Sequence, residues 1–287
     1  MTVPFLVVDR PASLEIIRNI RIPLNRQLGL MSHANTTNLF KDLFRDFPCP
    51  QKDYCEVIRK RCPNKKNYLK CKEGFYLQKK YIKIADSGVF TKEGCIFSYN
   101  DLFKEYEKMN VNFGVMIDYL KDQNKTIKSA QKAMDVYNSK KWNFNLMGVI
   151  QGNKLDEYID CYKFLKKIGF KYIAVGGLLK KRINTARYVQ VRDEKLLWSV
   201  LSNIRKIDHN GSIYALGCYA PSRHNKFLGL GIWGSDYKGW IFQYEKRYPN
   251  AKRGDIKARK SRFFQIRNFI YKNILCKKQL KSINTFD

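Results

Sequence analysis

The stretch YIKIADSGVF, at residues 81–90, places a short apolar run directly before an acidic residue and a small, flexible turn. A continuous apolar run of this length, bounded by turn residues, is typical of a buried strand in a parallel sheet. The same design recurs in FGVMID (113–118), LMGVIQG (146–152), YIAVGG (172–177), IYALGC (213–218) and LGLGIWGSD (228–236). The repetition predicts a set of parallel strands whose ends carry polar or small residues.

Segments with helical spacing separate these runs. Apolar residues lie three and four positions apart in YNDLFKEYEKM (99–109), TIKSAQKAMDVYNS (126–139), LDEYIDCYKFLKKIG (155–169) and DEKLLWSVLSNIRKI (193–207). Strands that alternate with amphipathic helices indicate a parallel sheet covered by helices. With FLVV (5–8) as a first strand, the count favours a closed (β/α)8 TIM-like barrel over an open doubly wound sheet. We expect the eighth strand after Trp240, within GWIFQYEKRY (239–248).

The chain length fits a single barrel domain spanning residues 1–287. Residues 9–80 do not follow the alternation, so we expect helices and loops inserted near the N-terminus. Residues 251–287 begin with the basic run AKRGDIKARKSR and continue as a helical segment. A stripe of Phe263, Ile266, Ile270 and Ile274 along that helix is expected to pack on the core.

The composition is strongly basic. Lys and Arg number 55 against 25 Asp and Glu, which gives a formal net charge of +30. Such an excess indicates a polyanionic partner, although a lysine-rich solvated surface is the alternative. The N-terminus has no signal-peptide pattern and no apolar run is long enough to span a membrane, so we expect a cytoplasmic protein. The eight cysteines are then expected to be reduced thiols or metal ligands.

Polar and small residues gather at the predicted strand ends. Because the strands of a parallel barrel end at one face, these side chains should share one pocket. A single Asp at such a position is often a helix N-cap, but a set at successive strands predicts a functional site. The set comprises Asp86, Asp118, Gln151, Gly176, Gly177 and Asp236.

These motifs resemble those of a known family. ADSGVF, GVMIDYL, GVIQG, YIAVGGLL and GIWGSDYKGW occur in the order found in the tRNA-guanine transglycosylase (queuine/archaeosine) superfamily, over roughly residues 80–242. The resemblance implies a (β/α)8 barrel that exchanges guanine for a 7-deazaguanine. The compact chain and the wording GVMIDYLKD and YIAVGGLLKK are most similar to the DNA-modifying branch of bacteria and phages.

The resemblance also implies roles for the residues. Asp236 matches the nucleophile, Asp86 the general acid/base and Asp118 the acid that reads the purine edge, while Gln151, Gly176 and Gly177 match groups that bind its carbonyl side. The residue types suit this chemistry. A carboxylate can form a covalent glycosyl intermediate, a second can shuttle the proton, and a third can accept the two adjacent N–H groups of guanine. The implied activity is that of a pentosyltransferase.

The family's zinc site has no match in this chain. That site has three closely spaced cysteines and a later histidine after the nucleophile, where this chain has only Cys276 and no histidine beyond His224. The upstream cysteines Cys49, Cys55, Cys62 and Cys71 are separated by five, six and eight residues, which is poor spacing for zinc. We therefore expect no metal, and leave a relocated zinc site as the alternative.

Basic residues near the predicted site are candidates for contacts with nucleic acid: Lys180, Lys181, Arg182, Arg223 and Lys238. The expected partners are DNA and a free base such as 7-cyano-7-deazaguanine, and the target guanine must leave its stack to react. Three alternatives stay open: the same exchange on tRNA, a catalytically inactive nucleic-acid-binding paralogue, and a barrel enzyme acting on a phosphorylated small molecule. A homodimer and partner proteins also stay open.

Overall fold

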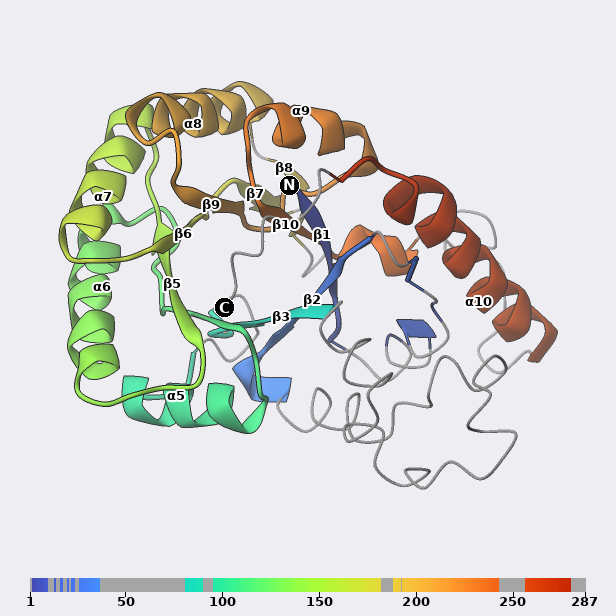
Figure 1. Cartoon of the computed structure of the whole chain (residues 1–287), viewed down its shortest axis with the longest axis horizontal. Helices are drawn as coiled ribbons and strands as arrows, with labels where there is room; N and C mark the ends of the chain where they lie inside the picture. Colours follow the sequence, from blue (N-terminus) through green and yellow to red (C-terminus); the bar gives the residue numbers. More distant parts are fainter. Residues whose placement is uncertain are drawn as a thin grey trace.

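Eight parallel strands close into a barrel, which confirms the predicted (β/α)8 fold (Figure 1). This computed structural model describes residues 2–9, 13, 16–17, 20, 22–23, 26–36, 81–89, 95–181, 188–191, 193–242 and 256–279. The strands follow one another around the barrel in the order β1, β10, β9, β6, β5, β4, β3 and β2. Their bounds are β1 Val3–Val7, β2 Leu28–His33, β3 Tyr81–Asp86, β4 Phe113–Val115, β5 Asn145–Ile150, β6 Tyr172–Val175, β9 Ser212–Ala215 and β10 Gly234–Tyr237.

Helices surround the strands (Figure 1). They are α5 Tyr99–Lys108, α6 Gln123–Asn138, α7 Leu155–Lys167, α8 Glu194–Ile207, α9 His224–Gly229 and α10 Ile256–Ile270, with short turns η1 Ala34–Thr36, η3 Pro221–Arg223, η4 Gly239–Phe242 and η5 Tyr271–Leu275. Each long helix buries the apolar stripe that its spacing predicted; α8, for example, buries Leu197, Val200, Leu201 and Ile204. Among the described residues, no helix is long and apolar enough to cross a membrane.

The position of the eighth strand was predicted wrongly. It is β2, Leu28–His33, within the segment expected to hold only helices and loops, and it pairs with both β1 and β3. Its Gly29 suits this place because a Cβ there would lie 2.1 Å from the ring of Phe5. The expected strand after Trp240 is instead a short 3-10 turn. Residues 243–248 of that expected strand lie outside the described residues, as do residues 37–80 of the expected insertion.

Aromatic rings fill the barrel interior. The Phe5 ring lies 5.2 Å from that of Tyr214 and 5.6 Å from that of Trp233. Trp233 in turn contacts Phe113, which contacts Tyr172. Since these rings come from strands on different sides of the barrel, only its interior can bring them together. The centre is therefore packed with side chains, and a pocket can form only at an end of the barrel.

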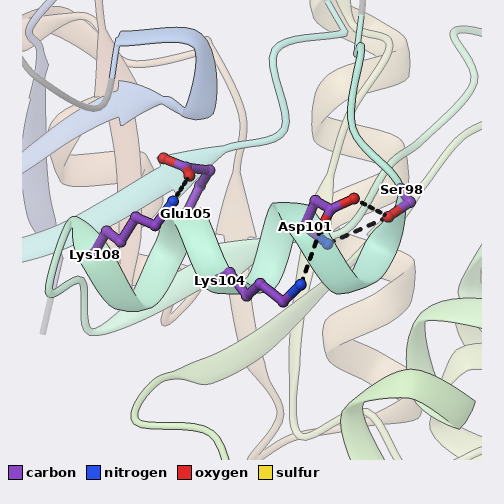
Figure 2. A network of polar contacts seen from close by, with 5 residues as sticks. All are labelled: Ser98, Asp101, Lys104, Glu105 and Lys108. Carbon is purple, nitrogen blue, oxygen red and sulfur yellow. Dashed lines mark hydrogen bonds and ion pairs between the residues drawn. The ribbon is translucent and has the colours of Figure 1, made fainter.

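A capping motif fixes the start of α5, as Figure 2 shows. The Ser98 hydroxyl accepts a hydrogen bond from the backbone N–H of Asp101 at 3.3 Å and donates one to the Asp101 carboxylate at 2.7 Å. Two ion pairs, Lys104 with Asp101 and Lys108 with Glu105, follow along the helix. The exposed pairs contribute little stability, whereas the cap defines where the segment after β3 becomes helical.

The last described segment packs on the barrel, as its apolar stripe predicted. Ile266, Ile270 and Ile274 are fully buried. The segment is also tied to the residues just before β2, because Arg26 Nε donates to the Leu275 carbonyl at 3.0 Å. Gln27 and Gln279 add two further hydrogen bonds. Residues 251–255 of the basic run lie outside the described residues, and residues 256–262 form the start of α10.

The lysine-rich segment after Gly177 is partly a hairpin. β7 (Leu179–Lys181) and β8 (Tyr188–Val191) pair in antiparallel fashion, apart from the barrel. The hairpin joins the end of β6 to the start of α8, so it leaves the barrel at the end where the parallel strands finish. Lys180 and Lys181 belong to β7, and Arg182 lies outside the described residues.

Candidate active site

The predicted site residues all lie where the parallel strands end. Asp86 is the last residue of β3, Gln151 directly follows β5, and Asp236 lies within β10. Gly176 and Gly177 directly follow β6, and Asp118 lies three residues beyond β4. The strand ends therefore place the whole set at one mouth of the barrel, where the βα connections of this fold form active sites.

Asp118 and Gln151 form a hydrogen-bonded pair inside this mouth. Gln151 Nε2 donates to Asp118 Oδ2, and Gln151 Oε1 accepts from the backbone N–H of Lys121 at 3.1 Å. Gln151 has no exposed surface and Asp118 is 2% exposed. The amide orientation follows from these contacts, because its oxygen faces a donor and its nitrogen faces a carboxylate. The second hydrogen of the Gln151 amide takes no part in these two contacts.

The two glycines after β6 make room for Gln151. A Cβ on Gly176 would lie 2.6 Å from Gln151 Nε2, and one on Gly177 would lie 2.2 Å from Gln151 Oε1. Gly177 also has φ of +71°, which disfavours other residues. The hydroxyl of buried Tyr158 donates to the Gly176 carbonyl at 3.0 Å. The backbone here is thus held directly against the amide of Gln151.

Replacing Gly177 with alanine is expected to displace Gln151 and lower the free energy of unfolding by about 2 kcal/mol, because steric overlap adds to an unfavourable φ. Any reaction that depends on the Asp118–Gln151 pair should fall with it. Gly229→Ala is the matched control, since nothing lies within 4 Å of a Cβ at that position. Chemical denaturation of both variants checks the effect; a Gly177→Ala protein as stable as Gly229→Ala would contradict it.

Asp236 is oriented by its neighbours on β9 and the turn that follows. Its Oδ1 accepts from the backbone N–H of Gly217 at 2.6 Å and from the Tyr214 hydroxyl at 3.4 Å. Its backbone carbonyl accepts from the N–H of Tyr219 at 3.0 Å. Both side-chain contacts fall on Oδ1. They orient the carboxylate and leave Oδ2 as the oxygen that can approach a substrate.

Burial makes the three carboxylates unusually basic. The pKa of Asp118 and that of Asp236 are each raised to about 7, mainly by desolvation and in addition by the charge of Asp86. Desolvation also raises the pKa of Asp86, which is partly buried. The Gly88 N–H, which donates to Asp86 Oδ1 at 2.7 Å, acts in the opposite direction. Carboxylates with a pKa near neutrality can hold or release a proton at the pH of a cell.

Two residues at the mouth were missed by the sequence analysis. His33 ends β2 and is the register partner of Asp86 on β3. Asp9 lies two residues beyond β1, and its carboxylate forms an ion pair with Lys238 at 2.7 Å. The strand-end rule that selected the other residues would also have selected His33, had residues 28–33 been recognised as a strand.

Two of the basic residues predicted to bind nucleic acid have protein partners. Lys238 contacts Asp9, as above. The Arg223 guanidinium forms an ion pair with Glu194 and donates from Nη1 to the Cys218 carbonyl at 3.0 Å. Lys238 directly follows β10, the strand that holds Asp236. Arg223 contacts the turn after β9, in which Gly217 donates to Asp236. A phosphate could reach them only by competing with a carboxylate.

Among the described residues, no group of three or more His, Cys, Asp or Glu side chains could hold a metal ion. The thiols of Cys95, Cys161, Cys218 and Cys276 are free. The alternative zinc ligands Cys49, Cys55, Cys62 and Cys71 lie outside the described residues.

Solved structures with the same fold include aldolases. The YdjI aldolase from Escherichia coli K12 matches with a TM-score of 0.55 and 11% sequence identity, over 95% of this chain and 91% of that chain. A protein assigned as a fructose-1,6-biphosphate aldolase from Coccidioides immitis matches with a TM-score of 0.56 and 7% identity, over 96% and 91%. Identities this low establish the barrel fold alone. No protein-family model and no curated protein sequence matches the chain.

Proposed function

We propose that this protein is an enzyme, a pentosyltransferase that exchanges a guanine in DNA for a free 7-deazaguanine such as 7-cyano-7-deazaguanine. The observation that carries the proposal is the pairing of Asp118 with Gln151 in a buried mouth that also holds Asp86 and Asp236. One pair can recognise a purine edge, and two further carboxylates can break and remake a glycosidic bond. The ordered sequence motifs support the same assignment.

Recognition of guanine requires acceptors for two N–H groups and a donor for O6. The Asp118 carboxylate, when ionised, accepts from N1–H and the exocyclic amine together. The second amide hydrogen of Gln151 and the backbone N–H of Gly177 are suited to donate to O6, whereas the Gly176 N–H already donates to the Ile150 carbonyl at 3.0 Å. A 7-deazaguanine has the same edge, so one pocket serves both the leaving and the incoming base.

The exchange proceeds in two balanced half-reactions. Asp236 Oδ2 attacks C1′ of the sugar, the C1′–N9 bond breaks, and a proton from Asp86 neutralises the departing guanine. The incoming base then loses its N9 proton to Asp86 and attacks C1′, which releases the Asp236 carboxylate. Two inversions at C1′ retain the stereochemistry, as in retaining glycosidases.

The polymer is assigned from charge and resemblance. A net charge of +30 favours a polyanion, and the β7–β8 hairpin, which carries Lys180 and Lys181, leaves the barrel at the mouth that holds the carboxylates. A guanine stacked in a duplex must flip out, or be presented in a single strand, to reach this mouth. The motifs closest to those of the DNA-modifying branch lead us to propose DNA rather than tRNA.

The test follows the release of labelled guanine. Purified protein is incubated with duplex DNA, single-stranded DNA or tRNA carrying radiolabelled guanine, with and without 7-cyano-7-deazaguanine. Release from DNA that depends on the added base supports the proposal. Release from tRNA alone would transfer the same chemistry to tRNA. An absence of release from all three, together with weak binding to each at physiological salt, would contradict the proposal and favour a small-molecule substrate.

A further inference from the structure

The end of β2 places a histidine beside the predicted acid/base residue. Six consecutive residues of β2 pair with β3, and the last register pair is His33 with Asp86. Neighbouring strands lie about 4.8 Å apart, and paired residues of a parallel sheet point to the same face. The two side chains therefore start next to each other and extend in the same direction.

That direction is the interior of the barrel. A Cβ on Gly29 would meet the ring of Phe5, which lies among the interior aromatic rings. Side chains alternate along a strand, so Gly29, Met31 and His33 share the inward face. His33 is partly buried at the last inward position of β2. Its imidazole thus belongs to the same mouth as the three carboxylates.

We propose that the His33 imidazole donates a hydrogen bond to the Asp86 carboxylate and thereby positions it and sets its affinity for the proton. The inference rests on the proposed function, in which Asp86 gives a proton to one base and takes it from another. His33 acts through Asp86, so it is a positioning residue. Two groups that interact electrostatically with Asp86, namely Asp118 and Asp236, are themselves acidic.

The charged surroundings of this pair come from every neighbouring strand. Continuing the β1–β2 register two residues beyond Val7 and Met31 places Asp9 beside His33, and Asp9 is held by Lys238. Asp118 and Asp236 are the other carboxylates of the mouth. The pKa of the Cys95 thiol is raised by burial and also by the charges of Asp86 and Asp118. The other carboxylates oppose the ionised form of Asp86, and the Gly88 N–H that donates to Asp86 Oδ1 only partly offsets them. A histidine next to Asp86 favours that form, and its intrinsic proton affinity suits exchange near neutral pH.

The first test needs no base exchange. The chain has three histidines, so their ring signals can be followed by NMR after histidine labelling and assigned by single replacement. Asp86→Asn should lower the titration midpoint of His33 by about one pH unit, because an adjacent negative charge is removed. His209, exposed on the turn after α8, is the internal control and should not move. An unchanged His33 midpoint, with the other two signals intact, would overturn the proposal.

The second test uses the pH profile of guanine release. His33→Phe should reduce kcat/KM about 100-fold and move the basic limb assigned to Asp86 to higher pH, because the donor to its carboxylate is lost and the pKa of Asp86 rises. His33→Gln, which keeps a neutral donor, should recover most of the rate, and His209→Gln should match the unmodified protein. A uniform loss in His33→Phe with the limb unmoved would show a packing role only and overturn the proposal. If the unmodified protein releases no guanine, the proposed function fails while the NMR titration still decides the contact.

Discussion

Replacing Asp236 with asparagine should abolish base exchange, with kcat/KM reduced by at least about 10⁴-fold. The asparagine retains the shape of the carboxylate and can still accept from the Gly217 N–H, but its amide cannot displace a base from C1′. Nucleic acid should still bind, because binding relies on the basic surface. Release of labelled guanine measures the first effect, and filter binding at several salt concentrations measures the second.

A covalent intermediate gives this prediction a second readout. Denaturing electrophoresis of the unmodified protein with labelled DNA should show a protein–DNA adduct when no incoming base is present, and the Asp236→Asn protein should show none. Asp135→Asn is the matched control, since Asp135 is exposed on α6 away from the mouth. If Asp236→Asn exchanges guanine at the rate of Asp135→Asn, Asp236 is not the nucleophile.

The barrel could be predicted because most of its strands are continuous apolar runs. Both faces of a parallel strand are covered, so YIKIAD, LMGVIQG and YIAVGG are recognisable without any tertiary information. The helices between them were equally clear, since the stripe of α8 has one face that must be buried. Parallel strands then have to end at one face, which is why Asp86, Gln151 and Asp236 could be assigned to one mouth.

The eighth strand could not be found in this way. LGLMSH has a glycine where the inward face meets the Phe5 ring, and it ends in Ser32 and His33, so its local pattern resembles a loop. Its strand conformation depends on pairing with β1 and β3, which are far away in sequence. The candidate GWIFQYEKRY is apolar at its start but does not begin as a strand. Trp240 lies in a 3-10 turn and is buried next to β1, where its Nε1 donates to the Val7 carbonyl at 3.0 Å.

The errors in the candidate site follow from that missing strand. Without β2, His33 had no strand to end, so the pattern of polar residues at strand ends did not select it. The ion pair of Lys238 with Asp9 likewise depends on β1 and β10 being neighbours in the closed barrel. The sequence could predict that Asp118 and Gln151 lie close together, but not which atoms of the two side chains meet. The backbone N–H of Lys121 binds the amide oxygen of Gln151 and so turns the amide nitrogen toward the carboxylate.

Replacing Asp118 with asparagine should stabilise the protein above neutral pH while it impairs the reaction. Burial raises the pKa of Asp118 from 3.8 to about 7, so the folded protein retains a proton that the unfolded chain has lost between these values. Stability from this group is fully present below pH 3.8 and is lost as pH rises through about 7. The asparagine pays no such cost, and at pH 8 the variant should be more stable by on the order of 2–4 kcal/mol.

The effect on activity has the opposite sign. The ionised carboxylate accepts both guanine N–H groups, whereas asparagine turns an N–H donor toward one of them, so kcat/KM should fall about 100- to 1,000-fold at pH 8. In the unmodified protein, kcat/KM should rise with pH through about 7 as Asp118 and Asp236 ionise. The pH range in which Asp118 and Asp236 become ionised for the reaction is therefore also the range in which their burial lowers the stability of the protein.

Denaturation of both proteins at pH 4 and pH 8 checks the sign. The stability difference between Asp118→Asn and the unmodified chain should be small at pH 4 and large at pH 8. His224, whose pKa is lowered by burial, gives stability that is lost as pH falls, but it is common to both proteins and cancels in the difference. Asp135→Asn should show no such trend. A less stable Asp118→Asn protein at pH 8 would contradict this prediction, because it would mean that the folded protein holds Asp118 as a stabilised anion and that burial does not raise its pKa.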